Sequence, residues 1–305
     1  MKNDKRVIGP FLMTGASSGI GRACVSALLQ AGAEVFASVR KSEDADKLRA
    51  DCGADAKLKV FLMDVAERES ILSAAQDVNY ALHGRGLAGL VNVAGIGMSG
   101  PLEYTSLEEL RYIFEVNVFG QIAVTQAFLP AIRAARGRIV NITSVGAHIS
   151  IPFGGALCSS KAALGLLNDS LRLELRPFGV RVIAIEPGAI HTPAVEKTLG
   201  DAERVIAKLP PEGAARYATI LRTITRRAKE REDKGSNPSV VAAAIVRALS
   251  DAHPRTRYVV GKDAHMLVTL PRVLPDRVLD WLRSRMLGLP ARAAGEVNRE
   301  IHKAA

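Results

Sequence analysis

The chain has 305 residues, of which 48% are hydrophobic and 24% charged, and its formal net charge at pH 7 is +10. This apolar fraction supports a large buried core, and abundant charges without low-complexity tracts argue against disorder. A basic balance is typical of proteins that meet nucleic acid, an anionic membrane surface or a phosphorylated cofactor.

Part of the basic excess is concentrated late in the chain. It comprises Arg216, Arg222, Arg226, Arg227, Lys229 and Arg231. No aromatic residues are interleaved with these cations, and the sequence has no zinc-finger or RNP-like pattern, so it predicts no nucleic-acid partner. We interpret the cluster as the solvated face of a helix.

The three cysteines, Cys24, Cys52 and Cys158, show no metal-ligand spacing, so no metal site is expected. An odd number of cysteines cannot all pair within the chain, which favours reduced thiols and a cytoplasmic setting. No signal-like apolar stretch follows the charged residues 1–6. The sequence also has no run of about 18 apolar residues, so no membrane-spanning helix is expected. A membrane contact is therefore expected to be peripheral at most.

Short apolar runs alternate with amphipathic stretches along most of the chain. Strands are expected at residues 11–13, 34–39, 58–63, 87–93, 138–143, 180–186 and 257–260, and helices at 20–31, 67–82, 107–135 and 238–250. Strands this apolar are buried on both faces, which favours a parallel sheet covered by helices. Right-handed crossovers then give an α/β fold, a Rossmann-type doubly wound parallel sheet of about seven strands.

Proline cannot donate to a strand ladder, so the first strand should begin at or after Pro10. We expect a single domain, 1–305, with its core at about 7–262. Residues 193–237 form a charged, mostly helical insertion, and residues 263–305 form a C-terminal arm. This arm could be a packing element, a dimer element or a surface-lying amphipathic piece, and packing is the favoured interpretation.

The first strand runs into the glycine-rich segment Thr14-Gly15-Ala16-Ser17-Ser18-Gly19-Ile20-Gly21. Its glycines let the backbone approach a pyrophosphate, and the start of the following helix supplies free N–H groups. The TGxxxGxG spacing, at the head of alternating strands and helices, resembles the fingerprint of the short-chain dehydrogenase/reductase family. The cofactor-binding residues predicted here are Gly15, Ser17, Ser18, Gly19, Ile20 and Gly21.

The end of the second strand should discriminate between nicotinamide cofactors. Proteins that bind NAD place an acid there to accept from the ribose 2′-hydroxyl. This chain has Val39 at that position, followed by Arg40, whose guanidinium can pair with a 2′-phosphate. We expect NADP(H) to be preferred, with NAD(H) as the alternative cofactor. The competing interpretation is that Arg40 and Lys41 are merely solvated.

The resemblance covers at least residues 7–193, continues more loosely through 254–289, and implies further cofactor contacts. Asp64 and Val65 are similar to the family's adenine-contacting pair. Val91-Asn92-Val93-Ala94-Gly95 follows the family pattern except that Val93 replaces a second asparagine. Pro187-Gly188-Ala189-Ile190-His191-Thr192 matches the PGxIxT segment that holds the nicotinamide amide. The resemblance thus implies contacts from Asp64, Val65, Asn92, Ala94, Gly95, Lys161, Pro187, Gly188, Ile190 and Thr192.

The family's chemistry uses an asparagine, a serine, a tyrosine and a lysine four residues after the tyrosine. The matching positions imply that Asn117 supports a proton-relay water, Ser144 orients the substrate oxygen and Lys161 holds the nicotinamide ribose. The tyrosine position is Leu157, and the distance from Ser144 to Leu157 fits the family's spacing. Leucine can neither donate nor accept a proton, and positioned acid–base groups contribute about 10²–10⁴-fold to rate. The chain should therefore turn over slowly or not at all.

Three nearby groups are candidates to substitute for the tyrosine. Cys158 points about 100° away around the helix from position 157 and is better interpreted as a small filler residue. His148 could line the substrate cleft but fits a loop histidine without a catalytic role. Lys161 could deliver a proton through water, but the ribose should already engage it.

The substrate loops are expected at 96–102, at 145–156 and after Thr192. Apolar residues of the second loop, with Leu157, predict an apolar cleft. Val39-Arg40 after the second strand, together with the long C-terminal arm, resembles the hydroxysteroid and retinol dehydrogenase branch. That resemblance implies a small apolar alcohol or ketone, steroid- or retinoid-like, as the substrate.

A non-catalytic NADP(H)-binding protein, acting as a sensor or partner subunit, is the alternative function. A scaffold that binds no nucleotide is a third reading, disfavoured by the intact glycine segment. By analogy, helices at 107–135 and 152–176 would pair two copies into a homodimer or homotetramer.

Overall fold

In the computed structural model, residues 9–53, 57–192 and 202–289 are described. Within them, seven parallel strands form one sheet in the order β3-β2-β1-β4-β5-β6-β7. The strands are β1 Pro10–Met13, β2 Glu34–Val39, β3 Leu58–Leu62, β4 Gly89–Asn92, β5 Arg138–Ile142, β6 Arg181–Pro187 and β7 Arg257–Val260. The chain winds outward from β1 to β3 and then returns to β4 beside β1. This confirms the predicted doubly wound sheet and the start of β1 at Pro10.

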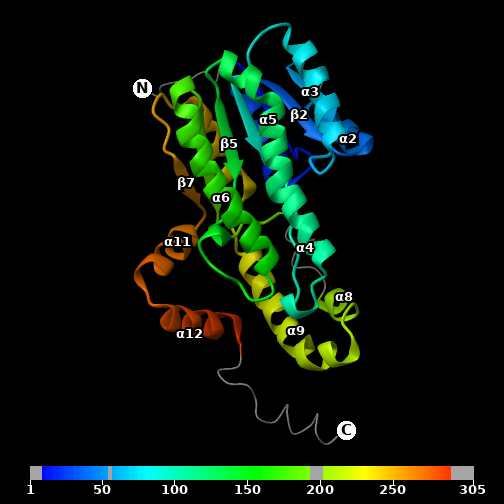
Figure 1. Cartoon of the computed structure of the whole chain (residues 1–305), viewed down its shortest axis with the longest axis vertical. Helices are drawn as coiled ribbons and strands as arrows, with labels where there is room; N and C mark the ends of the chain where they lie inside the picture. The colour runs from blue at the N-terminus through cyan, green and yellow to red at the C-terminus, as the bar shows by residue number, and fades with distance from the viewer. Residues whose placement is uncertain (1–8, 54–56, 193–201, 290–305) are drawn as a thin grey trace, which may run out of the picture.

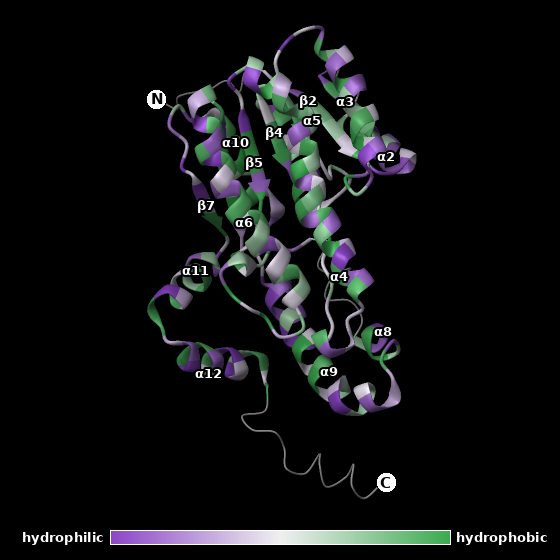
Figure 2. Cartoon of the chain, viewed as in Figure 1, coloured by the Kyte–Doolittle hydropathy of each residue, from purple (hydrophilic) through white to green (hydrophobic). Residues whose placement is uncertain are grey.

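Helices cover both faces of the sheet (Figure 1). They are α1 Gly19–Gln30, α2 Ser42–Cys52, α3 Arg68–Leu82, α4 Leu107–Phe114, α5 Gly120–Ala134, α6 Gly155–Leu175, α8 Ala202–Ile206, α9 Pro211–Asp233, α10 Pro238–Ser250, α11 Ala264–Val273 and α12 Asp276–Leu287. Buried residues of α1, α2 and α10 form one core with the sheet, and those of α3, α5 and the end of α6 form the second. Figure 2 shows the flanking helices with hydrophobic and hydrophilic faces, the pattern that makes each helix bury one side.

The stretch predicted as one helix at 107–135 contains a change of helical period. Between α4 and α5, residues Glu115–Phe119 form a π-helical turn, and Asn117 lies within it. A π turn holds one extra residue and therefore changes the direction in which the following side chains point. Gly120 closes the turn, and a Cβ there would overlap the Val65 carbonyl. This close approach sets α5 tightly against the loop after β3.

The insertion and the arm extend the molecule beyond the carboxyl ends of the strands, where α8, α9, α11 and α12 gather (Figure 1). Residues 193–201 of the predicted insertion and 290–305 of the predicted arm lie outside the described residues. The arm packs as expected at α11, where Ala264 and Val268 are buried against Val145. In α12, Leu279 is buried, whereas the Trp281 side chain is exposed. Among the described helices, none is both long and apolar enough to cross a membrane.

The basic face of α9 is exposed at Arg216, Arg222, Arg226 and Lys229, as the sequence predicted, and some of its arginines also pair with neighbouring elements. Arg222 pairs with Glu203 of α8 through Nε at 2.6 Å, and Arg216 pairs with Glu103 at 2.8 Å. The Arg227 guanidinium donates to the carbonyls of Arg285 and Met286 at the end of α12. These contacts bind α9 to its neighbours. The Arg227 contacts satisfy carbonyls at the C-terminus of α12 that lack intrahelical partners.

Candidate functional site

The glycine-rich segment forms a tight turn between β1 and α1. Gly15 has φ +66°, and a Cβ there would come within 2.8 Å of the Ala94 backbone. A Cβ on Gly21 would overlap the Gly15 carbonyl. Helix α1 begins at Gly19 with no side-chain cap and no acidic residue in its first turn. Its free N–H groups therefore fit an anionic group such as a pyrophosphate.

The turn is tied to the point where the strand order reverses. The Thr14 hydroxyl accepts hydrogen bonds from the backbone N–H groups of Val93 and Ala94, both at 3.0 Å. Ala16 N donates to the Ser38 carbonyl at the end of β2. These bonds hold the glycine turn beside the loop after β4, which is where open α/β sheets bind their ligands.

The predicted ribose-discriminating residue Arg40 is exposed at the end of β2, as is Lys41. Val39, at the position where an acid would stand, is buried in the sheet. Asp64 accepts from Ala66 N at 2.9 Å in the turn after β3, and the Val65 side chain is buried beside α5. Two strand ends therefore place these residues along the edge that carries the glycine turn, and their contacts with a nucleotide stay predictions.

The segment after β6 lies across the same edge. Thr192 approaches Gly19, where a Cβ would be 3.3 Å from the threonine side chain. Ile190 is buried and forms a bridge with Ser236, and Asp263 accepts from Ala189 N at 3.2 Å. A Cβ on Gly188 would overlap the Asp263 carboxylate. The structure thus brings the 187–192 segment to the glycine turn, as the resemblance implied.

Asn92 lies beneath the site instead of on its surface. Its side chain is 1% exposed and donates to the Thr125 hydroxyl at 3.1 Å and to the side-chain Oδ1 of Asn141 at 2.9 Å. Asn141 in turn donates to Asn168 of α6 at 3.0 Å. This buried amide ladder joins β4, β5, α5 and α6. The Asn92 side chain therefore supports the site from beneath, and the expected contact of Asn92 with a cofactor stays a prediction.

Lys161 and Asn117 meet beside Gly95. A Cβ on Gly95 would lie 3.2 Å from Asn117 Oδ1 and 3.5 Å from Lys161 Nζ. Lys161 is buried and donates to the Ile142 carbonyl at 2.8 Å, and burial lowers its pKa to about 8. The Asn117 amide is used by the backbone of Ile96, at 2.9 Å for each bond, and by the Ser160 hydroxyl at 3.0 Å. Asn117 thus holds the loop after β4 against α6.

Ser144 and Leu157 line one side of an apolar cavity of about 500 Å³ at the carboxyl edge of the sheet. The Ser144 hydroxyl caps the following 3₁₀ turn by accepting from Gly146 N at 3.0 Å. The opposite wall comes from α11 and α12, including Leu270, Leu279 and Leu282. The serine, the leucine and the cavity are therefore brought together as the sequence predicted, and the arm supplies a roof that the sequence had not shown.

The sequence is similar to those of known proteins. The family model for short chain dehydrogenase matches residues 11–203. The chain belongs to the short-chain dehydrogenase family. It is 36% identical over 292 residues to mouse (Mus musculus) retinol dehydrogenase 5, covering 93% of this chain and 90% of that one. It is 35% identical over 279 residues to human (Homo sapiens) retinol dehydrogenase 16, covering 88% and 87%.

Solved short-chain dehydrogenases share the fold. One from Streptomyces avermitilis aligns with a TM-score of 0.70 at 33% identity, covering 91% of this chain and 94% of that chain. Another, from Burkholderia cenocepacia J2315 in complex with NADP, aligns with a TM-score of 0.67 at 26% identity, covering 92% and 99%. The family is one of oxidoreductases, which is the class that the glycine turn and the serine and lysine positions had indicated.

His148 and Cys158, two candidate substitutes for the family tyrosine, are poorly suited to proton transfer in this chain. His148 Nε2 lies 3.0 Å from Glu186 Oε1, and the buried Glu186 also pairs with Arg257 of β7. The histidine is thus directed to an ion cluster and is not part of the described cavity lining. Cys158 does line the cavity, but burial raises the pKa of its thiol, so the thiolate is disfavoured.

The sequence did not predict Glu232 as a site residue. In the structure it lines the cavity from the last turn of α9. It is one of many charged residues in the insertion, and no motif marks it. Only the path of α9 across the carboxyl edge of the sheet brings this carboxyl to the same cavity as Ser144.

Proposed function

We propose that this protein is an NADP(H)-dependent oxidoreductase that interconverts an apolar, steroid- or retinoid-like alcohol with its carbonyl compound, and that Leu157 slows its turnover. The observation that carries the proposal is the apolar cavity lined by Ser144 and Leu157, and by Gly188 and Ala189 of the segment whose Thr192 approaches Gly19 of the glycine turn. The retinol dehydrogenase relatives support an apolar substrate.

The residues present fit a nicotinamide dinucleotide. The glycine turn leaves backbone space and uncapped N–H groups for the pyrophosphate, and Lys161 lies beside Gly95 for the nicotinamide ribose. The exposed Arg40 supports a preference for the 2′-phosphate of NADP(H). When bound, this cofactor supplies or accepts the hydride.

The protein's own residues position the substrate. The Ser144 hydroxyl can donate to the substrate oxygen, and the apolar walls from α6, α11 and α12 exclude water around the reacting carbon. Leu157 adds to the apolar wall but supplies no proton where the family has its tyrosine. Binding and orientation therefore remain available while one acid–base contribution is missing.

The test compares NADPH consumption by this chain and by Leu157→Tyr against a panel of apolar ketones and aldehydes. We expect the tyrosine to raise kcat by up to about 10²-fold, because a positioned acid contributes about 10²–10⁴-fold and another acid of the cavity can supply part of that contribution. Leu72→Tyr is the matched control, because Leu72 is a half-exposed leucine of α3 on a different part of the surface. Equal activity in this chain and Leu157→Tyr would refute the assigned role of position 157. Binding of NADPH by both without turnover would favour a non-catalytic nucleotide-binding protein.

We also propose a homodimer or homotetramer formed through α4, α5 and α6. Large apolar side chains of α6 and of the π turn before α5 are exposed in the single chain: Leu166 at 73% and Leu173 at 60% on α6, and Phe119 at 58% in the turn. Apolar residues that recur on one face of a helix are typical of an interface between subunits.

A further inference from the structure

Glu232 is the one carboxylate among the described residues that line the apolar cavity. It lies in the last turn of α9, a different part of the chain from Ser144 and Leu157, and all three line this same cavity. The backbone N–H of Ile190 donates to the Glu232 carboxylate. Ile190 belongs to the segment expected to hold the nicotinamide amide, so this carboxyl is hydrogen-bonded to that segment and lines the same cavity as Ser144.

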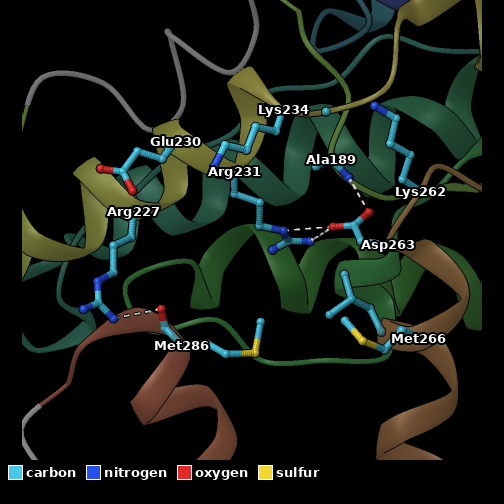
Figure 3. Close-up of a pocket in the computed structure, with 11 residues that line it drawn as sticks. Ala189, Arg227, Glu230, Arg231, Lys234, Lys262, Asp263, Met266 and Met286 are labelled. Atoms are coloured by element: carbon cyan, nitrogen blue, oxygen red, sulfur yellow. Dashed lines mark hydrogen bonds and ion pairs between the residues drawn. The ribbon is translucent and has the colours of Figure 1, made fainter.

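The surroundings of Glu232 favour its protonated form. Burial is the main cause that raises its pKa to about 7, and Asp263 and Asp233 add to the rise. Arg231 acts in the opposite direction, but its guanidinium is directed at Asp263, with Nε 2.9 Å from Oδ2 (Figure 3). The other charged or titratable side chains lining the cavity are Arg227, Arg283 and Cys158. Arg227 is held by the end of α12, and Arg283 donates to the Ser150 hydroxyl.

We propose that Glu232 is the proton-transfer residue of this chain and replaces the missing tyrosine. The inference rests on the proposed function. In the reducing direction, the carbonyl carbon receives the hydride and the C=O π pair moves onto oxygen. This pair takes the proton of the Glu232 carboxyl and forms the alcohol O–H bond. The resulting carboxylate then takes a proton from solvent, and in the oxidising direction it accepts the proton of the alcohol.

The Ile190 hydrogen bond couples this residue to the cofactor. The Ile190 N–H would hold the nicotinamide amide in the bound state and would then no longer donate to the Glu232 carboxylate. Loss of that donor raises the pKa of Glu232 further, because a hydrogen bond to the charged form had favoured ionisation. Nucleotide binding near pH 7 should therefore be accompanied by uptake of a fraction of a proton, which prepares the carboxyl as a donor.

The experiment uses the full chain, Glu232→Gln and the matched control Glu230→Gln. Glu230 lies on the same helix, is exposed and lines a neighbouring pocket (Figure 3). With NADPH and an apolar ketone, we expect Glu232→Gln to lower kcat by about 10²-fold with little change in KM. Glu230→Gln should change it by less than about twofold. The kcat of the unmodified chain should fall as the pH rises through about 7, and Glu232→Gln should lack this inflection.

Two further measurements separate catalysis from structure. In the Leu157→Tyr background, Glu232→Gln should lower kcat by less than about threefold, because the two donors substitute for each other. Calorimetric titration with NADPH, in two buffers of different ionisation enthalpy, should show proton uptake by the unmodified chain and by Glu230→Gln. The uptake should be absent in Glu232→Gln.

The outcomes also distinguish this inference from the proposed function. Turnover that is equal in the unmodified chain and Glu232→Gln, or proton uptake that is equal in both, overturns the role of Glu232 and leaves the proposed function standing. Activity that appears only with Leu157→Tyr also overturns the role of Glu232 and leaves the proposed function standing. Failure of the unmodified chain to bind NADPH overturns both.

Discussion

Lys161 should destabilise the protein when no nucleotide is bound. Its pKa falls from an ordinary value of 10.5 to about 8 because its ammonium is buried, with the Ile142 carbonyl 2.8 Å away. At about 1.4 kcal/mol for each pH unit, this difference corresponds to about 3 kcal/mol. Lys161→Met removes the buried charge and loses one hydrogen bond of about 1 kcal/mol. The variant should therefore be more stable than the unmodified chain at pH 7 by about 2 kcal/mol.

The pH dependence gives the sharper test. Between pH 8 and 10.5 the unfolded chain binds more protons at Lys161 than the folded chain does, so stability rises with pH across this window. Below pH 8 both states carry the proton and the full destabilisation is present. The advantage of Lys161→Met should thus shrink as the pH rises and reverse by about 1 kcal/mol near pH 10.5, where only the lost hydrogen bond remains.

Denaturant unfolding at pH 7 and pH 10, without nucleotide, measures both effects. Lys208→Met is the control, because Lys208 is an exposed lysine paired with Glu109 at 3.1 Å, and such pairs contribute about 0–1 kcal/mol. If Lys161→Met is less stable than the unmodified chain at pH 7, by an amount that does not change with pH, the buried ammonium is not destabilising. If Lys161→Met is instead more stable at pH 7, as expected, its loss of nucleotide affinity is the reason to retain a lysine that lowers stability.

Two further predictions concern the cofactor and the assembly. Arg40→Ser should raise the Kd for NADPH by about tenfold or more, the usual value of a hydrogen bond to a charged group, and leave the Kd for NADH unchanged, as measured by nicotinamide fluorescence titration. An equal change for both nucleotides would contradict a role in 2′-phosphate recognition. Leu166→Glu should reduce the particle mass measured by light scattering, since it places a charge in the proposed interface. An unchanged mass would exclude this face of α6.

The sheet was predictable because its strands are short apolar runs with clear breaks. Strand β2 has the predicted bounds at 34–39, and β5 ends one residue before the prediction. Proline chemistry alone located the start of β1 at Pro10. The glycine turn was predictable for a related reason: its residues are required by local backbone geometry, so they form a contiguous motif. Local constraints leave a local signature in the sequence.

The parts of the site that could not be predicted depend on long-range packing. The amide ladder from Asn92 to Asn168 joins strands and helices far apart in the chain, and each asparagine alone has no pattern. The π turn at Asn117 appears in the sequence as part of a continuous helix. The roof of the cavity requires α11 and α12 to fold back over the sheet edge, and nothing local to the arm indicates where it packs.

The replacement at position 157 can be understood from its place in the fold. Leu157 is only partly buried and faces the cavity, whereas its helix neighbours Ser160 and Lys161 face Asn117 and the end of β5. The residues that hold α6 in place are therefore distinct from the residue that would transfer the proton. Exchange of a tyrosine for leucine at this one position changes the wall of the cavity and leaves the amide ladder and the lysine contact intact. Such a chain keeps the glycine turn and the apolar cavity, and under the proposed function its chemistry depends on whichever acid reaches that cavity from another element.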